Sequence, residues 1–274
     1  MKKIDLHTHS TRSDGLLTPT QLLERAAGRG LRALALTDHD TVAGVEEAMR
    51  AGQRLGVRVV PGVEISVDFE PGTFHMLGLG IDLSNPALKE RLEFLQQARR
   101  DRNPLIVKKL REASVPITLE EVEAEAKGGQ VGRPHFAAVL LRKKVVATWE
   151  EAFDKWLGKG APGYMDKVRV SAADAIGMIH QAGGVAVLAH PVQLRLQDDA
   201  LAGFLDDMAS KKLDGIEVYH SDHGPREEAF YLELARRHGL KISGGSDYHG
   251  FANKPVGVGV PEVDESVLEN LLKP

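Results

Sequence analysis

The sequence predicts an α/β protein in which strands and helices alternate on both sides of a helical insertion. Apolar strand-like runs alternate with helical patterns along residues 1–82 and 166–274, an order typical of a parallel sheet. Residues 83–165 carry helical patterns but no strand-like run. We therefore expect a fold divided into a first part (1–82), a helical insertion (83–165) and a second part (166–274).

Seven runs are predicted to be strands because each is rich in Val, Ile or Leu and ends in polar residues. They are KIDLHTHS (3–10), LRALALTDHD (31–40), VRVVPGVEIS (57–66), FHMLGLGID (74–82), VAVLAHP (185–191), GIEVYHS (215–221) and KISGGSDYH (241–249). Several are almost continuously apolar, as expected for strands covered by helices on both faces.

Helices between these strands are predicted from their end signals. Thr18-Pro19 begins a helix that stops before Gly30, Thr41 begins one that ends near Gly56, and Ser171 begins one that runs to Gly183.

The insertion has helix signals of its own. Asn85-Pro86 opens a long helical pattern in which Pro104 predicts a kink, and Arg133-Pro134 precedes another apolar helix. Thr118 with Glu121, and Thr148 with Glu151, have the spacing of a capping box.

Composition restricts the function classes. The chain of 274 residues is 42% hydrophobic and 27% charged and has a formal net charge of -4, which argues against a broad electrostatic grip on long duplex nucleic acid. No apolar run approaches the length of a membrane span, and the polar start MKKIDLHTHS lacks a secretory signal, so we expect a cytoplasmic protein without a membrane partner. Because there is no cysteine, any metal must be bound by His, Asp and Glu.

Ionisable side chains gather at the ends of the predicted strands. His7 and His9 share one face of the first strand, and Asp14 follows in the loop. Other runs supply His39, Glu64, His75, His190 and His220, and the last supplies Asp247 and His249. In barrels of parallel strands the active site forms at the strands' carboxyl ends, so these residues should converge.

A single histidine at a strand end is more often a hydrogen-bonding residue than a metal ligand. His180 and His238 fit that interpretation because each lies in a helical pattern. The coincidence of His-x-His with ionisable groups at five further strand ends does not fit that interpretation. Burying so many ionisable groups together is costly unless cations compensate their charge. We therefore expect a metal centre.

Several motifs resemble those of the PHP (polymerase and histidinol phosphatase) family. They are His7-Thr8-His9 with Ser13-Asp14-Gly15, Thr37-Asp38-His39-Asp40, Pro61-Gly62-Val63-Glu64-Ile65, Ala189-His190-Pro191 and Gly245-Ser246-Asp247-Tyr248-His249. The resemblance covers residues 1–81 and 165–274. It implies a distorted seven-stranded (β/α)7 barrel with two or three divalent metal ions, manganese first, with iron or zinc as alternatives.

The same resemblance implies a ligand set. His7, His9, Glu64 and Asp247 would bind a first metal; Glu64 would bridge to a second, bound also by His75 and His190; and Asp14, His39 and His249 would bind a third. Three divalent cations with three carboxylates and one hydroxide leave a charge of about +2, which favours an anionic substrate. No G-x-S-x-G or G-x-x-x-x-G-K motif is present, so metal-activated water on a phosphoester is the predicted chemistry.

Substrate contacts follow from a narrower resemblance, carried by Phe74-His75-Met76-Leu77-Gly78, Gly132-Arg133-Pro134-His135 and residues 216–223. The PHP branch with these motifs includes nucleoside 3',5'-bisphosphate phosphatases and enzymes that trim short RNAs from the 5' end, and its insertion forms a substrate lid. By that analogy Arg133, His135 and Lys167 contact substrate, together with His220 or His223, and His223 either protonates the leaving oxygen or binds it. On the residues alone, Arg133 and Lys167 are equally compatible with solvated surface cations.

The predicted activity is metal-hydroxide attack on the 3'-phosphate of a nucleoside 3',5'-bisphosphate. Exonuclease action on short RNA, histidinol-phosphate hydrolysis, C–N hydrolysis and a noncatalytic metal-binding module remain alternatives. The sequence does not reveal metal identity, base preference or oligomeric state.

Overall fold

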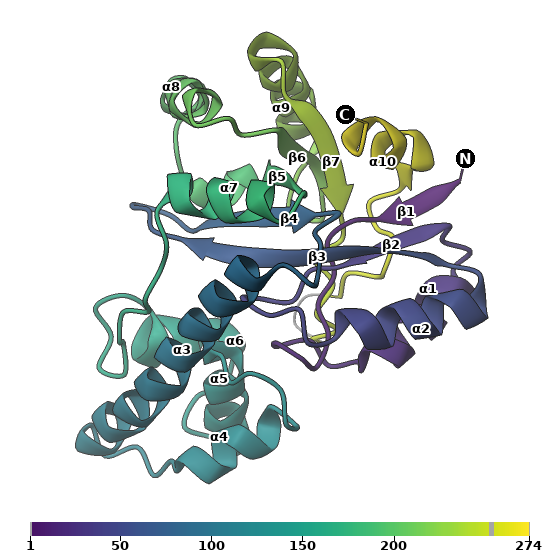
Figure 1. The fold of residues 1–274 in the computed structure, drawn as a ribbon. Coiled ribbons are helices and arrows are strands. Elements are labelled where there is room, and N and C mark those ends of the chain that lie inside the picture. The colour runs from purple at the N-terminus through teal and green to yellow at the C-terminus, as the bar shows by residue number, and fades with distance from the viewer. Residues whose placement is uncertain (1, 252–254, 274) are drawn as a thin grey trace.

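The computed structural model describes residues 2–251 and 255–273 and has an α/β architecture (Figure 1). Its strands are β1 (Lys3–Asp5), β2 (Ala33–Leu36), β3 (Arg58–Val67), β4 (Phe74–Leu79), β5 (Val185–Leu188), β6 (Gly215–His220), β7 (Lys241–Gly245) and β8 (Val263–Asp264). They form one sheet in the order β7-β6-β5-β4-β3-β2-β1-β8. The predicted count of seven is therefore one short, because the two-residue β8, antiparallel to β1, is too brief to give an apolar pattern.

The sheet curls until its first and seventh strands meet. Leu6 N donates to Gly244 O at 3.1 Å, and an isolated parallel bridge joins Thr8 to Tyr248 just beyond the two strands. These contacts make a nearly closed barrel.

The prediction of a parallel sheet is wrong for one strand. β4 is antiparallel to both of its neighbours, β3 and β5, whereas the pairs β1–β2, β2–β3, β5–β6 and β6–β7 are parallel. Only residues 68–73 separate β3 from β4, and a parallel crossover needs a dozen or more residues. As a result, the amino end of β4 lies at the same end of the barrel as the carboxyl ends of the parallel strands.

Helices cover the outside of the barrel (Figure 1). They are α1 (Pro19–Gly28), α2 (Val45–Leu55), α7 (Ala172–Gln181), α8 (Asp198–Ser210), α9 (Pro225–His238) and α10 (Glu265–Leu271), with a 3₁₀ turn, η2 (Pro191–Leu194). Thr18 and Ser171 cap α1 and α7 as predicted. Thr41 does not begin α2: its hydroxyl accepts from Ala43 N in a turn, and the helix starts four residues later, after Gly44.

The second group of helices lies below the sheet in Figure 1, and no strand lies between its helices along the chain. It consists of α3 (Pro86–Glu112), α4 (Leu119–Glu125), α5 (Arg133–Arg142), α6 (Trp149–Ala152) and the π-helix η1 (Phe153–Leu157). Thr118 and Glu121 form the predicted capping box. Thr148 caps α6, but the Glu151 carboxylate accepts from Ala147 N, so only half of the second capping box forms. Pro104 lies inside α3.

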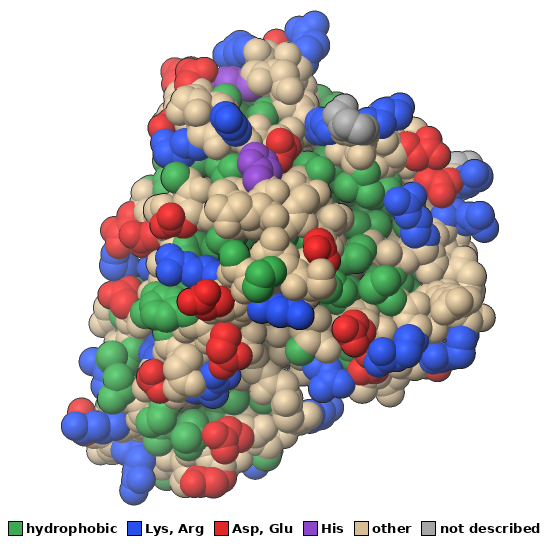
Figure 2. Space-filling model, in the orientation of Figure 1, with side chains coloured by type: hydrophobic (Ala, Val, Ile, Leu, Met, Phe, Trp, Pro, Cys, Tyr) green, Lys and Arg blue, Asp and Glu red, His purple; other side chains and the backbone are tan. Residues whose placement is uncertain are grey.

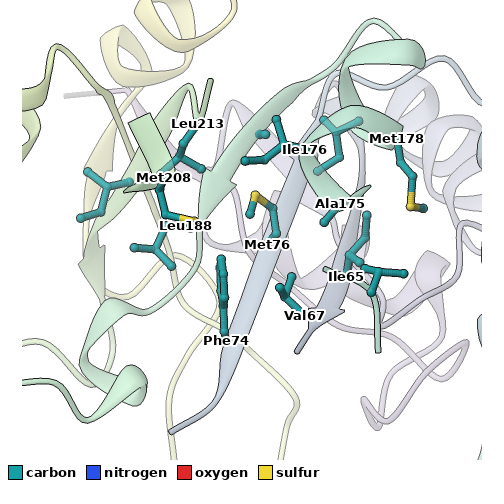
Figure 3. Close-up of a cluster of buried hydrophobic side chains, with 14 of the residues drawn as sticks. Ile65, Val67, Phe74, Met76, Ala175, Ile176, Met178, Leu188, Met208 and Leu213 are labelled. Atoms are coloured by element: carbon teal, nitrogen blue, oxygen red, sulfur yellow. The ribbon is translucent and has the colours of Figure 1, made fainter. Parts of the chain in front are cut away.

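Separate apolar clusters support the barrel and these helices. The largest packs β3 and β4 against α7 and α8, and Figure 3 shows Ile65 and Met76 facing Ile176 of α7. Burying a side chain of this size contributes about 1.5–3 kcal/mol. A different cluster is made only of residues 106–157 and includes the fully buried Phe136. The helical region thus has a core of its own, and the division of the chain at residues 83 and 165 stays a prediction.

The face of the molecule drawn in Figure 2 shows no dominant charge. On the face in Figure 2, basic and acidic side chains are interspersed, and little histidine is visible. Among the described residues, no helix is both long and apolar enough to cross a membrane.

Candidate metal centre

The nine predicted metal ligands meet at one end of the barrel. Four groups place their ligand atoms within 4.8 Å of one another: His9, Asp14, His39 and His249; His7, His220 and Asp247; His7, Glu64 and His190; and His39, Glu64 and His75. Most of these residues lie just after the carboxyl ends of β1, β2, β5 and β7, which share one end of the barrel. His75 joins them from the amino end of β4 because that strand runs in the opposite direction.

Two imidazoles and two carboxylates face each other at the centre of the site. His7 Nε2 lies 3.4 Å from both Glu64 Oε1 and Asp247 Oδ1, and His9 Nε2 lies 3.2 Å from Glu64 Oε2 and 3.3 Å from Asp247 Oδ1. Donor atoms about 2.1 Å from a tetrahedral cation are about 3.4 Å from one another. The spacing of these four residues therefore suits a single cation.

A second set of atoms surrounds Glu64 Oε1, the oxygen that also faces His7. His75 Nδ1 and His190 Nε2 each lie 2.9 Å from Glu64 Oε1, and the two nitrogens are 3.3 Å apart. Glu64 thus presents its carboxylate to both sets, the arrangement expected of a bridging ligand.

A looser set, which we call the outer group, comprises His9, Asp14, His39 and His249. His249 Nε2 is 3.3 Å from Asp14 Oδ1, and His39 Nε2 is 3.9 Å from Asp14 Oδ2. The Nδ1–H of His249 donates to the carbonyl of Asp247, so its Nε2 is left with a lone pair facing the group.

Buried polar atoms without hydrogen-bond partners test whether this centre suits metal ions. Among the described residues, such atoms include His7 Nε2, His9 Nε2, Asp14 Oδ1, His39 Nδ1, Glu64 Oε2 and His190 Nδ1. Buried polar atoms are rarely left unsatisfied, and cations compensate this donor set. The residues present therefore fit divalent metal ions.

The carboxylates of the centre are kept anionic. Burial alone raises the pKa of Glu64, but His39, His75 and His7 outweigh burial and bring it well below its usual range. Burial likewise opposes ionisation of Asp14, yet His39 and His249 lower its pKa well below the usual value. In His75 burial dominates and lowers the pKa to about 3, so this imidazole is neutral and able to bind a metal.

Glu217 of β6 is a part of the centre that the sequence analysis missed. Its carboxylate accepts from His7 Nδ1 at 3.0 Å and from His190 N at 2.7 Å. Although burial opposes ionisation, His7 and His220 lower the Glu217 pKa to about 2. Such a carboxylate fixes the orientation of a metal-binding imidazole. Its one sequence signal is a lone carboxylate inside the apolar run GIEVYH.

His220 lies within the centre. Its Nδ1 accepts from Asp222 N at 3.0 Å, and its buried Nε2, which has no hydrogen-bond partner among the described residues, lies 3.6 Å from Asp247 Oδ2. His220 therefore presents Nε2 to the group that it forms with His7 and Asp247.

The backbone at two predicted ligands is strained. His190 has a φ of 26° and Asp247 a φ of 52°, values that L-residues adopt at a cost of about 1–3 kcal/mol. Such outliers cluster at functional sites, where the surrounding structure holds a side chain in a required direction.

A cavity of about 400 Å³ opens beside the metal centre. Its metal end is formed by Asp14, His39, His75, Asp247 and His249. Its basic end, a name we keep for these five side chains, is formed by Arg99, Arg102, Arg133, Lys167 and Arg169. Aromatic rings of Phe69, Phe74, Trp149, Phe153 and Phe251 complete the lining.

The cations of the basic end are poorly neutralised. Within residues 2–251 and 255–273, Arg102 and Arg133 make no side-chain hydrogen bond or ion pair, and Arg102 is only 5% exposed. Burial, with Arg99 and Arg133 nearby, lowers the pKa of the Arg102 guanidinium to about 9. Arg102 and Arg133, which have no paired carboxylate in the described structure, indicate a site for an anion.

The Asp40 carboxylate lies next to the basic end of the cavity. Asp40 pairs with the Arg99 guanidinium and accepts from Ser66 N at 3.0 Å, while Lys167 Nζ donates to Ser66 Oγ. Burial first and Arg99 second lower the pKa of Lys167 well below its usual value. Two carboxylates therefore pair with cations of the basic end, Asp40 with Arg99 and Asp68 with Arg169 at 3.7 Å.

The predicted substrate residues occupy different places. Arg133 and Lys167 line the cavity, whereas His135, His220 and His223 are absent from its described lining. His135 Nδ1 accepts from Gly132 N at the start of α5. The buried His223 donates through Nδ1 to Val218 O, and burial lowers its pKa to about 4. Their roles as substrate contacts stay predictions.

Sequence reasoning did not single out Arg99, Arg102 or Arg169. The two α3 arginines sit in a helix with many other charges, and no local pattern separates them from solvated residues such as Arg100. Trp149 and Phe251 were missed as well; their ring centroids lie 4.9 Å apart.

Comparison with known proteins gives one family and several close relatives. The PHP domain matches residues 5–154. The 5'-3' exoribonuclease Rnm of Salmonella typhimurium is 39% identical over 249 residues, which cover 89% of this chain and 84% of the relative. The 3',5'-nucleoside bisphosphate phosphatase of Chromobacterium violaceum is 37% identical over 250 residues, with 91% and 88% coverage.

A third relative has a different substrate in its name. The phosphoribosyl 1,2-cyclic phosphate 1,2-diphosphodiesterase of Eggerthella lenta is 39% identical over 263 residues, which cover 94% of this chain and 98% of the relative. Among solved structures, a candidate metal-dependent phosphoesterase from Bifidobacterium adolescentis superposes with a TM-score of 0.88 at 35% identity, covering 98% of this chain and 95% of that protein.

Proposed function

This chain belongs to the PHP domain family of metal-dependent phosphoesterases, and from that premise we propose that it removes the 3'-phosphate of nucleoside 3',5'-bisphosphates. The observation that carries this proposal is a cavity lined both by predicted metal ligands and by cations. A metal end beside an incompletely neutralised basic end suits a substrate with two phosphates, one to be hydrolysed and one to be bound.

The metal ligands are assigned by their spacing. His7, His9, Glu64 and Asp247 would hold one cation, Glu64, His75 and His190 a second, and the outer group a third. When bound, divalent cations lower the pKa of a water molecule and withdraw charge from phosphoryl oxygens. Manganese is our first expectation, with iron or zinc as alternatives.

The remaining steps are performed by the chain's own side chains. Arg102 and Arg133, which lack partners in the described structure, would bind the 5'-phosphate and thereby place the 3'-phosphate at the metal end. Glu217 would keep the His7 ring in one orientation. Trp149 and Phe251 offer apolar surface for the nucleoside. Binding energy at one phosphate is thus used to orient the other.

Two other activities are kept as candidates because relatives carry their names. The first is 5'-3' release of nucleotides from short RNA, and the second is hydrolysis of a phosphoribosyl 1,2-cyclic phosphate. A cavity of about 400 Å³ with cations on one wall favours a compact bisphosphate over a longer chain.

The test compares three substrates on manganese-loaded protein. We expect phosphate release from adenosine 3',5'-bisphosphate to have a higher kcat/KM than cleavage of a 5'-phosphorylated short RNA or of the cyclic phosphate. His9→Ala should abolish turnover. His238→Ala is the matched control, because that histidine pairs with Asp206 away from the site. A higher kcat/KM on RNA or on the cyclic phosphate would contradict the proposal.

A further inference from the structure

One glutamine connects two metal-binding loops to the helical region. Gln130 lies between α4 and α5, and its Nε2 donates to the carbonyl of His39 at 3.0 Å. Its backbone N donates to the carbonyl of Arg12 at 3.2 Å. Arg12 precedes Asp14 by two residues, so Gln130 joins the loop of His39 to the loop of Asp14. Both of these residues belong to the outer group.

The neighbouring glycine brings the two main chains into direct contact. A Cβ at position 129 would lie 1.7 Å from the Thr11 carbonyl oxygen, a distance that no side chain tolerates. The approach of loop 128–132 to the loop of Asp14 therefore requires glycine. This contact holds Gln130 against both loops.

Helix α3 adds a second attachment one residue further along. Gln96 Nε2 donates to the carbonyl of Asp40 at 3.1 Å, and the Arg99 guanidinium pairs with the Asp40 carboxylate. Asp40 has a φ of 52°, a conformation that needs such support. The carbonyls of His39 and Asp40 are thus both bound by glutamines of the helical region.

The other ligands are supported differently. His7 and His190 receive their contacts from Glu217 of β6, and His190 also contacts Glu64 of β3. These partners all belong to the barrel. Within the described residues, the helical region therefore supports the outer group in particular.

We propose that Gln130 is a positioning residue through which the helical region sets the affinity of the outer group for its divalent cation. This inference rests on the proposed function, because it takes the outer group to be a metal site. A ligand loop that loses an outer-shell hydrogen bond typically binds its metal about 10- to 100-fold more weakly. The effect should be largest for the cation of the outer group and smaller for a cation bound by Glu64, which His39 Nδ1 also approaches at 2.8 Å.

The experiment measures metal binding directly. Metal-free wild type, Gln130→Met and Gln97→Met are titrated with Mn²⁺ by calorimetry and electron paramagnetic resonance, and the ions retained after dialysis are counted by mass spectrometry. Gln97 is the matched control, because it lies on the exposed face of α3 and pairs with Asp101 and Arg100. We expect Gln130→Met to retain one ion fewer than wild type and to bind that ion about 10- to 100-fold more weakly. Gln97→Met should bind Mn²⁺ as the wild type does. The thermal midpoint of metal-free Gln130→Met should equal that of metal-free wild type.

The outcomes separate this inference from the proposed function. Wild type that binds no Mn²⁺ would overturn the metal centre and both proposals with it. Wild type that binds Mn²⁺ while Gln130→Met binds it equally well, or loses every ion, would overturn the positioning role alone. Gly129→Ala is the second variant, since its Cβ must push the loop away from Thr11, and it should lose the same ion.

Discussion

The two ends of the cavity carry opposite charges and differ in how those charges are balanced. At the metal end, anionic Glu64 and Asp247 face imidazoles at 3.2–3.4 Å, and Glu217 fixes one of those rings from behind. At the basic end, Arg102 lies among other cations and has no hydrogen-bonding partner in the described structure. The metal end brings the predicted ligands close together, whereas Arg102 and Arg133 at the basic end have no paired carboxylate among the described residues, and a bound anion would supply that charge.

The two ends of the cavity are also formed by different parts of the sequence. The metal end comes from strand ends of the barrel, and much of the basic end comes from α3, α5 and the segment that returns to the barrel. On the proposed function, the barrel would supply the metal ligands, and the helical region would supply most of the positive charge that binds the substrate. Changes at the two ends should consequently have different kinetic effects.

The largest effect is expected for Glu64→Gln. Glu64 contacts both the His7–His9 pair and the His75–His190 pair, and a neutral amide would weaken each set. We expect kcat/KM to fall by more than about 100-fold, the upper loss typical of an outer-shell partner. Mn²⁺ content after dialysis should fall in parallel. A variant that keeps its full complement of metal would show that Glu64 is not a bridging ligand.

Glu217→Gln should have a smaller effect at the same end. The amide can still contact His7 but no longer supplies a charge to its ring. Metal affinity should drop about 10- to 100-fold, measured by titration with Mn²⁺, and turnover should recover when excess metal is added. Loss of turnover that metal does not restore would argue for a direct catalytic role.

At the basic end, Arg102→Met should change binding of substrate rather than of metal. A hydrogen bond to a charged group contributes about 1.5 kcal/mol or more, so KM for a bisphosphate should rise about tenfold. Because a buried and unpaired cation is removed, the thermal midpoint of ligand-free protein should rise. Arg100→Met, on the exposed side of the same helix, is the control. Equal KM values in the two variants would refute this role for Arg102.

The smallest effect is expected from pH at Lys167. Its pKa is lowered by burial and by Arg99, so the folded, anion-free protein holds one proton fewer than the unfolded chain below the ordinary value of 10.5. Stability should therefore rise with pH between the lowered value and 10.5. A bound phosphate favours the charged amine, so KM for a bisphosphate should increase with pH. In Lys167→Met both dependences should flatten, and a KM profile identical to that of wild type would exclude Lys167 from the anion site.

Sequence reasoning was most successful where each residue's role depends on its position along a strand. His7, His39 and His190 could be placed together because carboxyl ends of parallel strands share one edge. His75 lies with the other predicted ligands, but the reason was not visible in the sequence, since the reversal of β4 depends on the short connection after β3. The prediction that Thr41 begins a helix was wrong, because in sequence a threonine that stabilises a turn resembles one that caps a helix.

The basic end could be predicted only in part, for a physical reason. Arg133 and Lys167 lie in recognisable motifs, whereas Arg102 becomes special only through the helix packing that buries it. Helical sequence specifies which face a residue occupies but not what that face meets. Glu217 could not be predicted for the same reason, because its contact with the His7 imidazole is set by the fold and not by the sequence around it.

The contact of Gly129 with Thr11 limits how this protein can be recombined. The helical region has its own apolar core, so exchanging residues 83–165 with those of a relative would look like a clean graft. A donor segment whose counterpart of Gly129 bears a side chain would instead lift the loop that carries Asp14. Chimeras that keep the glycine and the following glutamine are therefore the ones that should assemble a complete active site.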